Sequence, residues 1–142
     1  MSVLLEVCCG DIASVGAARS AGAARIELCS ALTEGGLTPT PAMTRMAVDA
    51  GGPAVNVLIR PRSGDFLYSA DEVAQMEAEI TDAVAAGADG IVVGALTADG
   101  DVDIDVMRRF MAVADGRPVT FHRAFDLCRD PRKAFDDPVS YT

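Results

Sequence analysis

Short β-rich runs alternate with alanine-rich stretches of helical spacing, and this alternation limits the possible folds more than any other feature. The β-rich runs cover residues 4–9, 25–29, 54–60, 90–94 and 119–123. Between the third and fourth runs, Val73, Met76, Ile80 and Ala83 recur every three or four residues, which is typical of one helix face. Strands that alternate with helices predict parallel βα units and an α/β fold.

Each helical stretch opens with a residue suited to an N-cap, whose side chain accepts a hydrogen bond from the first helical turn. These residues are Asp11, Thr40 before Pro41, Ser69 with Glu72 as a capping box, Asp103, and Asp130 before Pro131. The turns that end the helices are short and contain glycine, whereas the segments that follow the strands are longer. Loops after the strands build the site in parallel βα proteins, so a site is expected there.

The first two strands share the pattern apolar, Glu, apolar, Cys, at residues 5–8 and 26–29. Side chains alternate between the faces of a strand, so the polar and apolar members of this pattern separate. The polar face carries Glu6, Cys8, Glu27 and Cys29. An open doubly wound sheet has helices on both faces, and its central strands are apolar throughout. A polar face therefore favours a parallel (β/α) barrel of the TIM type with a polar upper interior.

Polar side chains gather toward the carboxyl ends of the predicted strands, where barrel enzymes place their chemistry. They are Glu6, Cys8, Glu27, Cys29, Asn56, Arg60, Arg62, Asp65, His122, Arg123 and Asp126. Burying several charges is unfavourable unless they pair with one another or meet a ligand. Two interpretations follow: a structural polar network, for instance with Glu27 paired to Arg60, or a functional site. The pair Gly35-Gly36 would let the backbone approach an anion closely.

Charge and hydropathy exclude several classes of protein. The chain has 142 residues, with 12 Lys and Arg against 21 Asp and Glu, which gives a formal net charge of −9. Nucleic-acid binding needs a basic face, and an anionic membrane surface would also be repelled. No apolar run approaches the roughly 18 residues of a spanning helix, and no basic flank marks a signal peptide. The cytosol is the expected compartment, where the four cysteines act as thiols or metal ligands.

Six linked stretches, in order, resemble the CutC family, whose members are often labelled copper homeostasis proteins. They are residues 5–8 (LEVC), 22–30 (GAARIELCS), 35–39 (GGLTP), 59–66 (IRPRSGDF) with 68–69, 89–97 (DGIVVGALT) with 99–100, and 120–126 (TFHRAFD). The resemblance implies a cytosolic (β/α)₈-type barrel, often a homo-oligomer, that handles copper.

The length of the chain is short for such a barrel, which typically needs about 250 residues. We therefore expect residues 1–142 to form a single partial barrel domain, truncated to about five βα units. Residues 136–142 depart from the family pattern and are expected to form a tail outside it. A truncated or frameshifted reading frame is the corresponding hypothesis.

Three functions remain open. The first is Cu(I) binding, because Cu(I) prefers soft thiolates and Cys8 and Cys29 hold equivalent positions on neighbouring predicted strands. The second is an enzyme for a small anionic metabolite, with isomerase, lyase and hydrolase chemistry all open. Its candidate catalytic residues are Glu27, His122, Glu6 and Asp126, and its candidate ligand-binding residues are Arg60, Arg62, Asp65 and Arg123. The third is an inactive fragment, since five strands without closure leave two exposed edges.

Overall fold

The computed structural model describes the backbone of residues 3–141 and the side chains as far as residue 137. Parallel strands form one sheet in the order β1-β2-β3-β4-β5. They are β1 (Glu6–Cys9), β2 (Arg25–Leu28), β3 (Ala54–Leu58), β4 (Gly90–Val93) and β5 (Val119–Phe121). Each strand falls inside a β-rich run of the sequence, so the prediction of an α/β fold with a parallel sheet is confirmed.

Helical segments follow the strands, as the sequence predicts. They are α1 (Ile12–Ser20), η1 (Leu32–Glu34), α2 (Pro41–Ala50), α3 (Ala70–Ala85), α4 (Ile104–Val113), η2 (Arg123–Leu127) and α5 (Pro131–Tyr141), where η marks a 3₁₀ turn. The predicted capping is confirmed. Asp11, Thr40, Ser69 and Asp103 each accept a hydrogen bond from an amide in the first turn of their helix. Asp130 Oδ1 accepts hydrogen bonds from the Arg132 and Lys133 amides.

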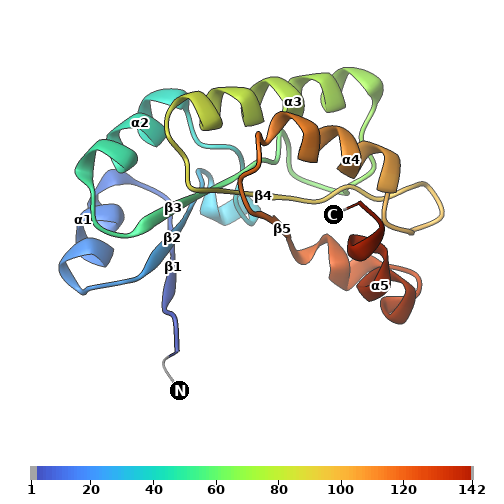
Figure 1. Ribbon diagram of the computed structural model, residues 1–142, viewed down its shortest axis with the longest axis horizontal. Helices are drawn as coiled ribbons and strands as arrows, with labels where there is room; N and C mark the ends of the chain where they lie inside the picture. The colour runs from blue at the N-terminus through green and yellow to red at the C-terminus, as the bar shows by residue number, and fades with distance from the viewer. Residues whose placement is uncertain (1–2, 142) are drawn as a thin grey trace.

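One face of the sheet packs against helices and forms the apolar core. Figure 1 shows α2, α3 and α4 lying along one side of the strands. Met76 and Ile80 of α3 and Met107 and Phe110 of α4 are all 0% exposed. The strands contribute Ile26, Leu28, Val57, Ile91 and Val93, each at most 1% exposed. The apolar members of the strand alternation therefore face the helices, as the sequence predicts.

The other face of the sheet carries polar side chains, and the sheet is open. Along this face Cys8 lies beside Glu27, and Glu27 lies beside Asn56. Among residues 3–141, β1 and β5 each pair with one neighbouring strand only, so this part of the chain does not close into a barrel. The prediction of a parallel sheet with one polar face is confirmed, and the sheet of residues 3–141 is open.

The last helix continues through residues that the sequence analysis expects to form a separate tail. α5 spans Pro131–Tyr141 and packs against α4. Lys133 forms an ion pair with Asp137 one turn further on, at 3.1 Å. Residues 136–141 are therefore part of the helix that ends the described fold.

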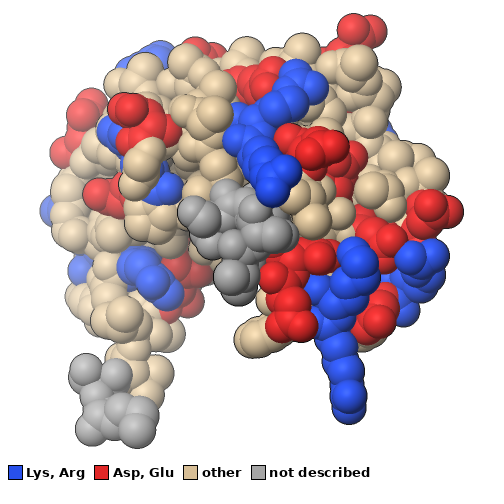
Figure 2. Space-filling model, turned by 45° about the vertical axis from the view of Figure 1, so that its right-hand side comes forward, with Lys and Arg blue, Asp and Glu red and all other residues tan. Residues whose placement is uncertain are grey.

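The surface is a mixture of charges. Figure 2 shows acidic and basic side chains interspersed over the face in view, without one dominant basic patch. Several are paired, as in Arg109 with Glu77 at 2.8 Å and Arg129 with Asp101 at 2.7 Å. Within residues 3–141 every helix is too short or too polar to cross a membrane.

Candidate functional site

A pocket of about 220 Å³ opens on the polar face of the sheet. The strands β2 to β5 contribute Glu27, Leu58, Val92 and Thr120, and the segments that follow strands contribute Gly35, Arg60, Phe66, His122 and Arg123. Four of the residues selected from the sequence therefore meet in one place: Glu27, Arg60, His122 and Arg123. They come together because alternate residues of parallel strands point to the same face, and the strands end at the same edge.

Arg60 is a buried cation, only 5% exposed. Its guanidinium donates hydrogen bonds to the carbonyl oxygens of Glu34, Gly36 and Gly64, at 2.9, 3.2 and 3.0 Å. It lies 5.1 Å from the centre of the Phe66 ring. Its Nε atom is buried and has no hydrogen-bond partner within the described residues. Carbonyl dipoles thus hold this charge in place, but no carboxylate among those residues neutralises it.

A second guanidinium approaches the first beside Gly35. A Cβ atom added to Gly35 would lie 3.0 Å from Nη1 of Arg123 and 3.3 Å from Nη1 of Arg60. Gly35 also has φ +82°, a conformation that side chains disfavour. Glycine at this position therefore lets two positive groups converge on one wall of the pocket. The sequence predicts a close approach of this backbone to an anion, whereas the groups that lie against Gly35 are two arginine side chains.

His122 presents a neutral imidazole to the pocket. Its Nδ1 accepts a hydrogen bond from the Ala124 amide at 3.2 Å, which assigns the ring proton to Nε2. That Nε2 atom is buried and has no partner within the described part of the chain. Burial, with the Arg60 charge as a second cause, lowers the pKa of His122 to about 4. The imidazole is therefore a hydrogen-bond donor, rather than a cation, near neutral pH.

Glu27 is the acidic residue of the pocket and is half-buried. Burial, and secondly the Glu6 charge, raise the pKa of the Glu27 carboxyl above its usual range. The ion pair between Glu27 and Arg60, which the sequence offers as an example of a structural network, does not form, because Arg60 is bonded to backbone carbonyls instead. Glu27 and Arg60 are thus not joined to each other in a structural polar network.

The two candidate metal ligands lie next to each other beside the pocket. The Sγ atoms of Cys8 and Cys29 are 3.7 Å apart, and all four cysteines are free. Their positions are not equivalent, because Cys8 pairs with Glu27 and not with Cys29 in the register of β1 and β2. Burial, with smaller contributions from Cys8 and Glu27, raises the pKa of the Cys29 thiol to about 12. No group of three or more His, Cys, Asp or Glu suited to a metal occurs within the described residues.

Four of the eight predicted catalytic and ligand-binding residues lie outside the pocket lining. Glu6 forms an ion pair with Arg25 at 3.0 Å and accepts a hydrogen bond from Asn56 at 2.9 Å. Asp126 is exposed in η2. Arg62 and Asp65 belong to the segment between β3 and α3 and bind each other. Local partners hold Glu6, Arg62 and Asp65 in place.

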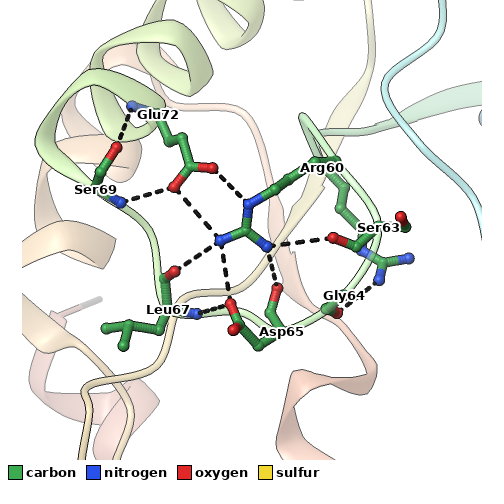
Figure 3. A network of polar contacts seen from close by, with 8 residues as sticks. Arg60, Ser63, Gly64, Asp65, Leu67, Ser69 and Glu72 are labelled. Carbon is green, nitrogen blue, oxygen red and sulfur yellow. Dashed lines mark hydrogen bonds and ion pairs between the residues drawn. The ribbon is translucent and has the colours of Figure 1, made fainter.

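Arg62 organises the loop before α3 and does not enter the pocket. Its guanidinium pairs with Glu72 and Asp65 and donates to the carbonyl oxygen of Leu67 at 2.8 Å. Figure 3 shows Glu72 at the start of the helix, and Leu67 and Asp65 on the loop that precedes it. Its charge is thus compensated locally, in contrast to that of Arg60.

Two residues that shape the site were not selected from the sequence. The Phe66 ring lies 5.0 Å from the His122 ring and also underlies Arg60. Gly94 leaves room for the imidazole, since a Cβ there would lie 2.7 Å from its Nδ1. An apolar ring in a polar loop and a glycine at a strand end are weak signals, and neither specifies a contact with a residue far along the chain.

The sequence matches the family model described as the CutC family over residues 3–141. The chain belongs to the CutC family. A relative from Chromobacterium violaceum, named family protein CutC, is 47% identical over 140 residues, which are 99% of this chain and 57% of that protein. A human relative, named copper homeostasis protein cutC homolog, is 47% identical over 133 residues, which are 94% of this chain and 49% of that protein. The chain spans about half the length of these relatives.

A solved structure of a CutC protein agrees with this assignment. A CutC protein from Streptococcus agalactiae superposes with a TM-score of 0.91 at 33% identity, covering 98% of this chain and 69% of that chain. A protein described as a phosphonomutase, from Burkholderia cenocepacia, gives a TM-score of 0.54 at 20% identity, covering 87% of this chain and 48% of that one. The second similarity concerns the fold alone. The family predicted from the linked motifs is thus confirmed.

Proposed function

We propose that this chain serves copper homeostasis by binding Cu(I) between the sulfurs of Cys8 and Cys29. Membership of the CutC family and the name of the human relative support the copper role. The observation that carries the proposed site is the 3.7 Å separation of the two Sγ atoms on neighbouring strands.

The two sulfurs suit a soft metal ion with few ligands. Cu(I) prefers thiolates over nitrogen and oxygen ligands. Two metal–sulfur bonds of about 2.3 Å, the length found for zinc thiolates, span at most about 4.6 Å. Sulfurs 3.7 Å apart would therefore move by no more than ~1 Å to hold an ion between them. The metal would displace the thiol protons on binding, and Leu58 and Val92, which cluster with Cys29, would shield the buried side of the site.

The experiment is a competition for Cu(I) between the purified chain and a chromophoric chelator. The chain with both Cys8→Ser and Cys29→Ser should lose its high-affinity site. Cys128→Ser is the matched control, because Cys128 is buried like Cys29 but lies at the end of η2, where its thiol donates to the Ala124 carbonyl. Equal affinity of the wild type and the double variant would overturn the proposed site, provided that circular dichroism shows both proteins folded.

The proposal also includes a complete barrel fold and a cytoplasmic location. The open sheet would be the first part of a (β/α)₈-type barrel, which is supported by the TM-score of 0.91 to a CutC structure of which this chain covers 69%. A reducing compartment such as the cytoplasm would keep the four cysteines free. Fractionation of cells that produce the tagged chain would test the location, and recovery in a membrane or secreted fraction would contradict it.

A further inference from the structure

The pocket contains polar groups that the proposed copper site does not use. Arg60, His122 and Arg123 all line it, and Arg60 and His122 each have a buried nitrogen without a partner among the described residues. Buried polar atoms in folded proteins are almost always hydrogen-bonded. Two unpaired buried nitrogens beside a pocket therefore indicate that a ligand binds there.

Arg60 gives the strongest reason to expect a negative ligand. The side chain is 5% exposed, and the three groups that hold it are neutral carbonyls. A buried charge is unfavourable unless an opposite charge compensates it. Arg123 adds a second positive charge at Gly35 and has no ion pair within the described residues. Two guanidinium groups that converge in this way are the usual recognition element for a carboxylate or a phosphate.

We infer that the pocket binds a small oxyanion, a carboxylate or a phosphate group, between Arg60 and Arg123, with the Nε2–H group of His122 as a hydrogen-bond donor. The volume of about 220 Å³ limits the occupant, because pockets for drug-sized ligands start near 300 Å³. The formal charge of −9 makes the chain as a whole repel anions. Binding of an anion must therefore come from this local arrangement.

Glu27 determines which chemical group the ligand can carry at the end away from the two arginines. Its carboxyl group lines the same pocket and forms no ion pair with either arginine. A second anionic group on the ligand would meet this side chain unfavourably, whereas a hydroxyl group could donate a hydrogen bond to it. The ligand class is therefore an oxyanion with a hydroxyl or other donor group, such as a hydroxy acid or a phosphate.

The single histidine of the chain makes a direct test possible, because the sequence contains one His. Its imidazole nitrogens give isolated signals in two-dimensional ¹H–¹⁵N NMR spectra. Inorganic phosphate and glycolate are titrated separately at constant ionic strength near neutral pH. A saturable shift of the His122 Nε2 signal is expected with one or both probes, and the responding probe tells whether the site takes phosphate or carboxylate. No saturable shift with either probe would overturn the inference.

Arg123→Gln is the decisive variant, because Arg123 is exposed and its loss removes no internal hydrogen bond of the described residues. It should weaken binding at least about tenfold, as expected for a lost hydrogen bond to a charged group. Arg45→Gln on α2 is the matched control, since it makes the same change of charge on an exposed side chain outside the pocket lining. If both variants weakened anion binding equally, the effect would come from the net charge of the chain, and the proposed site would be overturned.

The anion site and the copper site can fail independently. The double variant Cys8→Ser, Cys29→Ser should retain the phosphate or glycolate response, because neither cysteine lines the pocket. Arg123→Gln should retain Cu(I) binding. A lost anion response in the cysteine variant, with the fold intact by circular dichroism, would contradict a separate site.

Discussion

The buried imidazole of His122 should make the folding stability of this chain fall as the pH drops from about 6.5 to about 4. Burial and the nearby Arg60 charge lower the pKa of His122 from its ordinary 6.5 to about 4 in the folded chain. Between these values the unfolded chain binds a proton at this site and the folded chain does not, so the free energy of unfolding decreases toward acid. Each pKa unit corresponds to about 1.36 kcal/mol, and the full effect is roughly 3 kcal/mol.

The variant His122→Gln isolates this contribution. Glutamine cannot titrate, so the variant binds no proton at this position in either the folded or the unfolded chain. Other groups titrate in the same range, among them Glu27, whose pKa burial raises. Because they are present in both proteins, the difference between the two stability curves reports His122. Urea unfolding followed by circular dichroism, at several pH values from about 7 down to about 4.5, gives both curves.

The wild type should lose stability relative to His122→Gln by roughly 2 to 3 kcal/mol across this range, most steeply below about pH 6. A change in the free energy of unfolding that is the same at every pH does not affect this comparison. Parallel curves would refute the reasoning. So would an NMR titration of the imidazole that gives a pKa near 6.5, since the ring would then not be buried beside a cation.

Three further predictions concern packing and local structure, all measured by urea unfolding. Phe110 is 0% exposed, so Phe110→Ala should cost about 3–5 kcal/mol, and a loss below about 1 kcal/mol would argue against the α4 packing. Gly94→Ala should cost about 1–3 kcal/mol, because the new Cβ would lie 2.7 Å from the His122 ring. Gly16→Ala on α1, where nothing lies within 4 Å, should instead stabilise by about 0.5–1 kcal/mol; the same sign for both glycines would contradict the structure. Thr40→Ala removes the side chain that caps α2 and should cost about 1 kcal/mol, whereas no loss would mean that the cap is dispensable.

Local rules were enough to predict the strands and the first residues of the α-helices. Strand positions follow from short β-rich runs between the helical stretches, and helix starts follow from capping residues such as Asp11 and Ser69. Both depend on residues a few positions apart, and the sequence shows those directly. The assignment of faces also depends on a local period, so Ile26 and Leu28 could be placed toward the helices.

The register between strands could not be predicted in the same way. The repeated pattern in β1 and β2 suggests that Cys8 lies beside Cys29, but Cys8 lies beside Glu27. The register of parallel strands depends on how all strands of the sheet stagger and twist together, which no single pair of motifs encodes. The sulfurs still approach to 3.7 Å, because residues two apart on one strand share a face and a diagonal neighbour is within reach.

Arg60 and Arg62 show why some predicted site residues enter the pocket and others do not. The extended conformation of β3 continues to Arg60. The Ile59 amide donates a hydrogen bond to the Val92 carbonyl. The Arg60 amide donates to the Thr38 hydroxyl, and the Arg60 carbonyl accepts from the Thr38 amide. The alternation of faces therefore still applies there and directs Arg60 toward the pocket. From Pro61 the chain bends, so alternation no longer decides where Arg62 points, and its nearest carboxylates do. Arg62 is neutralised by its own loop, whereas Arg60 keeps an uncompensated charge, and that remaining charge is what an anionic ligand would recognise.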